Sequence, residues 1–332
     1  MSQVRGMRVG SWVEVRSVEE ILATLDDCGH LDAVPFMPEM LQHCGKRFRV
    51  FRSAHKTCDT IENYKIPRRM TNAVHLDGLR CNGEAHGGCQ ARCLVFWKKA
   101  WLKSVKGPHP PADAATAASK AQLEAARPGP RCDKEGLFRA TRAPAGSDVA
   151  SADRYSCQAT NLLEATAPLR WWDPRHYFTD LVSGNVRLSE FVRYGTLATF
   201  KFVKRLCLHG GPYPDVLGLA GENTPTVTLG LQPGDLVKIR SKNEIMHTIN
   251  AKQKNRGLFF DIEMVPYCGN VYRVLARVER IIDEKTGRMI NIPGSCLILD
   301  GVTCSGHYSK CRMFCPRSIY PYWREIWLER VV

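Results

Sequence analysis

The chain contains one segment twice, and this internal repeat limits the possible architectures more than any other feature of the sequence. Residues 10–50 align without a gap with residues 234–274, and 14 of the 41 aligned positions are identical. Similarity at a fixed offset is the signature of a repeated structural unit. We therefore expect two copies of one fold within a single chain.

The repeat resumes near the end of each copy, where cysteines and tryptophans recur. The matching segments are Leu76–Cys81 with Leu299–Cys304, Cys89-x3-Cys93 with Cys311-x3-Cys315, and Trp97-x3-Trp101 with Trp323-x3-Trp327. These matches predict one cysteine-rich module at residues 10–103 and a second at residues 234–330. Between them, the Ala/Pro-rich residues 104–153 predict a linker, and residues 154–213 predict a helical insert because apolar side chains recur every three or four positions.

Each module opens with a short strand that follows a glycine. Apolar and polar residues alternate over residues 12–15 and 236–239, which is typical of strands. Ser17 followed by Glu20 predicts the capped start of a short helix, and residues 271–282 predict a longer strand that enters a hairpin. The expected fold is mixed and mainly β: tandem duplicated SH3-like small barrels, each with a cysteine-rich helical extension, flanking the helical insert.

Four cysteine positions occur in both modules and carry the main functional signal. The pairs are Cys44/Cys268, Cys81/Cys304, Cys89/Cys311 and Cys93/Cys315. Four thiolates are the number that saturates a zinc ion or a four-iron cluster. Cys89 and Cys93 would lie one turn apart if their segment were helical, and the glycines before them would let the backbone fold around a ligand. The sequence therefore predicts a metal site in each module.

The spacing of these cysteines favours an iron–sulfur cluster (4Fe–4S) over zinc. Structural zinc sites usually take ligand pairs separated by two residues, and neither module has such a pair. Thiolates around a four-iron cluster also stand further apart than those around one zinc ion. Zinc remains the alternative, and burial as small core side chains is the interpretation without a metal, above all for Cys44 and Cys268.

Aromatic and histidine side chains near the cysteines are further candidates for the site. His86 and His307 lie between the first and second cysteines of their triplets, where they could ligate or hydrogen-bond, although an exposed loop position is the simpler interpretation. Tryptophans spaced at four residues could shield the site from water, or simply pack in the core: Trp97, Trp101, Trp323 and Trp327.

The composition limits the cellular compartment and the kinds of partner that we expect for this chain. Fourteen cysteines follow an N-terminal stretch without the apolar segment of a secretory signal, which argues against a disulfide framework and for a cytoplasmic metal protein. No apolar run approaches the roughly 18 residues that span a bilayer. The net charge of +14 is spread along the chain, so it permits an acidic partner without marking a nucleic-acid groove.

The first functional hypothesis is an iron–sulfur protein that acts in the redox or sulfur chemistry of a biosynthetic pathway, with a redox or biosynthetic partner protein. The second is a zinc-stabilised tandem SH3-like binding module for an acidic partner, either nucleic acid or protein. Its motivation is a set of aromatic and basic residues that could stack on bases: Tyr320, Tyr322, Trp323, Arg317 and Arg324.

The third hypothesis is an enzyme that uses a cysteine nucleophile. Cys157 precedes His176 in the insert, and a cysteine with a nearby histidine is the basis of many nucleophilic sites. Cys157 is one of several cysteines without a counterpart in the other module. The sequence assigns no role to the others, of which the most notable are Cys58, Cys132 and Cys296.

Overall fold

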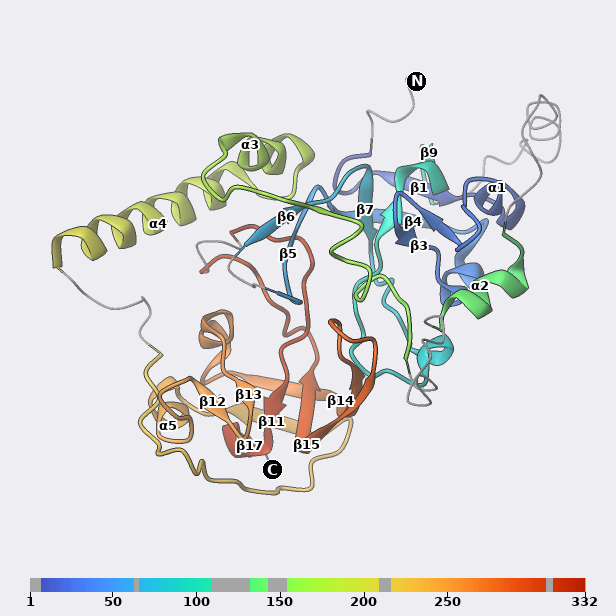
Figure 1. The fold of residues 1–332 in the computed structure, drawn as a ribbon. Helices are drawn as coiled ribbons and strands as arrows, with labels where there is room; N and C mark the ends of the chain where they lie inside the picture. Colours follow the sequence, from blue (N-terminus) through green and yellow to red (C-terminus); the bar gives the residue numbers. More distant parts are fainter. Residues whose placement is uncertain are drawn as a thin grey trace.

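The computed structural model describes residues 7–62, 66–108, 132–142, 154–208, 216–308 and 313–331. These residues form several antiparallel sheets and few helices, which confirms the mainly β class. In Figure 1 the N-terminal module and the insert make up the upper part of the molecule, and the C-terminal module makes up the lower part.

The N-terminal module is built on a five-stranded antiparallel sheet of order β8-β7-β4-β1-β9. Its strands are β1 (Trp12–Val15), β4 (Arg47–Ser53), β7 (Ala73–Leu76), β8 (Trp97–Lys98) and β9 (Leu102–Val105). Between β1 and β4 lie helix α1 (Val18–Leu22), the small hairpin β2 (His30–Leu31) and β3 (Val34–Pro35), and the 3-10 helix η2 (Pro38–His43). A further 3-10 turn, η4 (Lys99–Trp101), joins β8 to β9.

The C-terminal module has the same element order, and its sheet has the equivalent strand order, β16-β15-β14-β11-β17. Its strands are β11 (Leu236–Ile239), β14 (Val271–Ile282), β15 (Met289–Leu299), β16 (Trp323–Arg324) and β17 (Leu328–Arg330). The intervening elements are α5 (Lys242–Met246), β12 (Lys254–Asn255), β13 (Leu258–Phe259), η6 (Ile262–Tyr267) and η7 (Glu325–Trp327). The expected hairpin is present, as β14 and β15.

Both sheets are open at their ends in the described part of the chain. The first ends at β8 and β9 and the second at β16 and β17, and neither pair of end strands is hydrogen-bonded. A closed SH3-like barrel, which the short strands predict, is therefore not found among the described residues.

The two cores repeat one another in detail. Phe36 lies edge-on to Trp97 and Trp101, with ring centroids 6.2 and 5.2 Å apart. Phe260 makes the same contacts with Trp323 and Trp327, at 6.2 and 5.3 Å. All four indoles are fully buried in these cores. The tryptophans therefore pack the two cores, and their shielding of a metal site stays a prediction.

Segments outside the repeat surround the N-terminal module. They form a three-stranded sheet and three helices: β5 (Lys56–Cys58), β6 (Pro67–Arg69), β10 (Ala167–Pro168), α2 (Lys134–Ala140), α3 (Pro174–Ser183) and α4 (Leu188–Leu208). The last two helices agree with a helical insert. The short helix α2 lies within the predicted linker and buries Leu137 against the first core.

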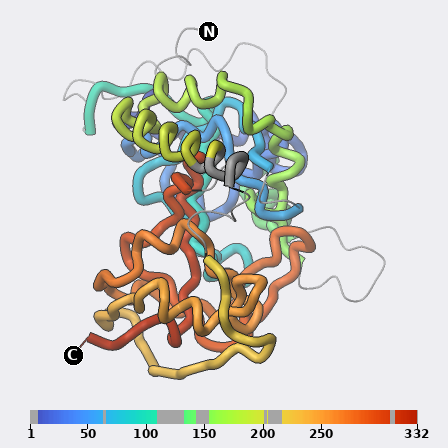
Figure 2. Tube along the Cα trace, turned by 90° about the vertical axis from the view of Figure 1, so that its left-hand side faces the viewer, coloured from blue at the N-terminus to red at the C-terminus, as the bar shows by residue number. Residues whose placement is uncertain are grey.

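The two modules meet through the segments that carry their cysteines. After β15 the chain rises from the lower part of the molecule to the upper part and returns to β16 (Figures 1 and 2). Arg80 donates to the carbonyl of Ser318, and the amide of Gln90 donates to the carbonyl of Arg280. The cysteine loops of both modules thus lie at one interface.

Candidate metal centre

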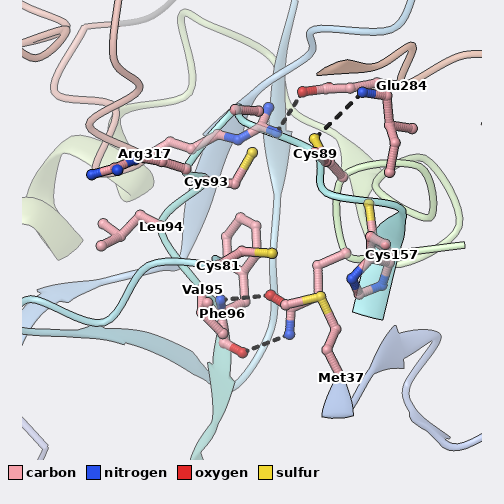
Figure 3. A pocket seen from close by; sticks show the side chains of 16 residues that line it. Met37, Cys81, Cys89, Cys93, Leu94, Val95, Phe96, Cys157, Glu284 and Arg317 are labelled. Carbon is pink, nitrogen blue, oxygen red and sulfur yellow. Dashed lines mark hydrogen bonds and ion pairs between the residues drawn. The ribbon is translucent and has the colours of Figure 1, made fainter. Parts of the chain in front are cut away.

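Four cysteine thiols face one cavity at this interface, as Figure 3 shows. Cys81, Cys89 and Cys93 come from the N-terminal module, and Cys157 comes from the insert. The cavity has a volume of about 40 Å³, which is room for a few water molecules or a small inorganic group. The structure therefore brings three of the predicted ligands together and adds a fourth thiol.

The loop between Cys81 and Cys93 folds back sharply on itself. The amide of Cys81 donates to the carbonyl of Cys93 at 2.9 Å, which closes the loop. Gly83 has φ +76°, and a Cβ at this position would lie 2.0 Å from the carbonyl oxygen of Cys89. Only glycine fits this close approach of two backbone segments. The glycine therefore allows the loop to fold so that its three thiols face one cavity.

Cys89 and Cys93 do not lie on a helix, so the predicted helical extension is wrong. In this fully described loop only η3 (Glu84–His86) is helical. Left-handed backbone interrupts the rest, because φ is positive at Gly87, Gly88 and Arg92. A folded loop, rather than one face of a helix, gathers the sulfurs.

Gln158 holds the neighbouring Cys157 at the cavity. Its side-chain oxygen accepts from the amide of Phe96 at 2.8 Å, and its amide donates to the carbonyls of Phe96 and Pro35, both at 2.9 Å. These three bonds replace water around buried backbone groups. They fix the insert against the end of the cysteine loop.

The C-terminal module supplies a buried cation and a sulfur hydrogen bond to the same cavity. The amide of Ile282 donates to Sγ of Cys89 at 3.4 Å. Arg317 forms an ion pair with Glu284 at 3.1 Å, and its side chain is only 3% exposed. Cys93 and this guanidinium lie close enough for their charges to interact. A buried guanidinium is stable only with an anion beside it, and Glu284 supplies that anion here.

Burial favours the protonated form of three of these thiols, Cys81, Cys93 and Cys157. Burial raises the pKa of Cys157 to about 11 and that of Cys93 to about 12. Burial and the Glu39 carboxylate together raise the pKa of Cys81 well above its usual range. A bound metal would reverse this balance, because its own charge stabilises the thiolate.

Glu39 holds the cysteine loop in place through contacts with two of its side chains. Its Oε1 lies 2.6 Å from His86 Nδ1 and accepts from the Cys81 thiol at 3.4 Å. These three side chains form the one group of potential ligands in the described chain whose donor atoms all lie within 4.8 Å of one another. His86 Nε2 also contacts the carbonyl of Ser156 at 3.1 Å, so both ring nitrogens are engaged. Sequence reasoning missed Glu39, although its identity with Glu263 in the repeat was a usable signal.

Cys44 and Cys268 lie elsewhere. Each follows the 3-10 helix of its module and packs against that module's core. Burial raises the pKa of each thiol to about 11. The structure does not bring Cys44 to the cavity, and Cys157 lies there in its place.

The equivalent cysteines of the C-terminal module are partly described. Cys304 is half-buried and Cys315 is buried, and the amide of Cys304 donates to the carbonyl of Ile319 at 2.7 Å. Cys311 lies outside the described residues, so its predicted role stays a prediction. His307 stacks on Tyr194 with ring centroids 4.1 Å apart, and its amide donates to Glu263. Glu263 thus braces the second cysteine loop much as Glu39 braces the first.

His176 and Cys157 have different surroundings. The Nδ1 of His176 lies 3.3 Å from the ammonium of Lys56, which also pairs with the buried Asp180. Burial and the adjacent ammonium lower the pKa of His176 to about 4. With its pKa raised rather than lowered, Cys157 lacks the main property of an activated nucleophile.

The residues that could stack on nucleic acid are mostly inaccessible. Trp323, Arg317 and Arg324 are at most 4% exposed, and each is engaged in the core or in internal ion pairs and hydrogen bonds. Among the described residues, no helix combines the length and the apolar character that crossing a bilayer requires.

Comparisons with protein families, curated proteins and solved structures find no match to this chain. Its function therefore has to be argued from the geometry of the site.

Proposed function

We propose that Cys81, Cys89, Cys93 and Cys157 hold an iron–sulfur cluster of the 4Fe–4S type, and that the protein acts in redox or sulfur chemistry. The observation that carries this proposal is that four thiols from two distant segments face one small cavity. Four cysteines are the usual complement of such a cluster. When bound, the cluster supplies a centre that accepts and releases single electrons.

The spacing of the sulfurs supports a cluster over zinc. Four thiolates around one zinc ion, at Zn–S of about 2.3 Å, would stand within roughly 4 Å of one another. No three cysteine sulfurs of the described residues come within 4.8 Å of one another. Thiolates around a four-iron cluster stand further apart, so a cubane fits this arrangement better than a single ion does.

The protein's own residues provide the surroundings that such a centre needs. The Ile282 amide donates to Cys89, and N–H···S bonds of this kind raise the reduction potential of a cluster. Arg317 places a positive charge beside Cys93, which offsets the negative charge of a thiolate-bound cluster. Met37 and Phe96 cover the apolar side of the cavity and limit the access of water.

Anaerobic purification followed by iron and sulfide analysis tests the proposal. The chain should be brown, and the first site should contribute about four iron atoms. Cys157→Ser should lose that iron, whereas Cys44→Ser should keep it, because Cys44 lies in the core. A colourless protein that carries zinc would favour the zinc-stabilised binding module instead. Iron that depends on Cys44 and not on Cys157 would contradict the ligand set.

A further inference from the structure

A second group of cysteines lies across the interface from the first. Cys315 and Cys58 are both buried, and their thiols are hydrogen-bonded to each other. Cys304 lies near the same segment, because its amide donates to the carbonyl of Ile319, four residues after Cys315, at 2.7 Å. Cys58 belongs to β5 of the N-terminal half, whereas the other two belong to the C-terminal module.

Contacts between the two halves hold this group together. The Lys56 ammonium, two residues before Cys58, donates to the carbonyl of Met313 at 2.8 Å. Arg317, two residues after Cys315, donates to Thr60 at 2.7 Å. The two chain segments are therefore tied together on both sides of the Cys58–Cys315 pair.

This second group of thiols is assembled in the same way as the first site. There, the cysteine loop of the N-terminal module meets Cys157, which comes from outside the repeat. Here, the corresponding loop of the C-terminal module meets Cys58, which has no counterpart in the repeat either. In both places a duplicated loop supplies some thiols, and a segment of different origin supplies another.

We propose that Cys58, Cys304 and Cys315 form a second thiolate site, which binds an iron–sulfur cluster across the interface between the two halves of the chain. The nature of the bound group rests on the function proposed above, but the site itself rests on these three residues.

Arg317 lies between the two sites. Its guanidinium interacts with Cys93 of the first site and with Cys58 and Cys315 of the second. Two thiolate-bound clusters are both anionic and repel each other at short range. A buried cation between them reduces that repulsion. Because one side chain reaches both thiol groups, the two clusters would lie near enough for their unpaired electrons to interact.

The test counts iron and acid-labile sulfide per chain after anaerobic reconstitution of the full chain with ferrous iron and sulfide. The wild type should bind about eight iron atoms, four for each cluster. The double variant Cys58→Ser/Cys315→Ser should lose about half of them. The matched control is Cys296→Ser, which removes another buried thiol of the C-terminal module and should keep all the iron.

Electron paramagnetic resonance of the reduced protein provides a second readout. The wild type should give a spectrum broadened by magnetic coupling between two clusters, and Cys58→Ser/Cys315→Ser should give the spectrum of one isolated cluster. If the double variant does not fold, Cys304→Ser replaces it, because that thiol is only half-buried.

The outcomes separate the two proposals. About four iron atoms that persist in Cys58→Ser/Cys315→Ser would overturn the second site and leave the first intact. Iron that is lost in this variant but kept in Cys157→Ser would support the second site and overturn the first. A reconstituted wild type without iron would overturn both.

Discussion

The two modules share a framework and differ in what they add to it. Both place a phenylalanine edge-on to two tryptophans in the core, and both brace the cysteine loop with a glutamate from the 3-10 helix. Glu39 does so through the side chains of Cys81 and His86, whereas Glu263 accepts from a hydroxyl and two backbone amides. The carboxylate is the part of this contact that the two modules share.

The modules differ more in their central strands. In the C-terminal module β14 and β15 have 12 and 11 residues, whereas their counterparts β4 and β7 have 7 and 4. The extra length carries Ile282 and Glu284 to the cavity of the N-terminal module. The comparison teaches that the repeat supplies the sheets and the cysteine loops, while segments outside it or extended beyond it complete the sites.

The largest expected effect comes from the turn that gathers the thiols of the first site. In Gly83→Ala the new Cβ would lie 2.0 Å from a backbone oxygen, at a φ of +76°. Strain and overpacking together should destabilise the N-terminal module by about 3–5 kcal/mol and remove the iron of the first site.

Gly78→Ala is the matched control, because its φ is +72° and nothing lies within 4 Å of the added Cβ. It should cost about 1–2 kcal/mol and leave the iron content unchanged. Thermal unfolding and iron analysis of both variants measure the difference. Equal iron loss in the two variants would show that the close approach at Gly83 does not build the site.

The two sheets differ at a buried side chain of β7. His75 of β7 occupies the position of Ile298 in β15 and is completely buried. Burial lowers the pKa of His75 to about 4, with small contributions from Arg317 and Arg80. Between pH 6.5 and 4 the unfolded chain therefore binds a proton that the native chain does not, so stability falls as the pH falls.

For one histidine this loss amounts to about 3 kcal/mol over the whole window. His75→Ile should flatten the pH dependence of the free energy of unfolding by that amount and leave the slope above pH 7 unchanged. Urea unfolding at several pH values measures the slope. His55 and His176 titrate in the same window, so only the difference between variant and wild type reports on His75. An unchanged slope would mean that His75 is protonated in the native state.

The sequence predicted the frame of each module well, because its signals are local. Alternation over residues 12–15, the cap at Ser17 and the β14–β15 hairpin all depend on neighbouring residues, and all are present. The helix through Cys89 and Cys93 was wrong, because a four-residue spacing suits a loop as well as a helix, and the glycines before it favour the loop.

The composition of the candidate site depends on long-range contacts that no local pattern reports. Cys157 reaches the cavity because Gln158 binds the backbone of Phe96, 62 residues earlier. Arg317 resembled an exposed basic residue in the sequence, and only the packing of the two halves buries it beside Glu284. Single-sequence periodicity contains no information on either contact.

The smallest expected effect tests whether the two modules are energetically independent. Ser17 and Ser241 cap equivalent helices, and each accepts from the backbone amide three residues later, at 3.2 and 3.3 Å. Replacing either by alanine should cost about 1 kcal/mol. The effect should be somewhat larger at Ser17, because its partner Glu20 is also held by Arg16 and Lys103, whereas Glu244 is half exposed.

Ser104→Ala is the control: it lies at an exposed position of β9 and should have almost no effect. Thermal unfolding of the single and double variants measures these changes. If the modules are energetically independent, each substitution should lower only the unfolding transition of its own module. A single transition that both substitutions lower, with additive effects in the double variant, would mean that the modules unfold as one unit through the shared cysteine interface.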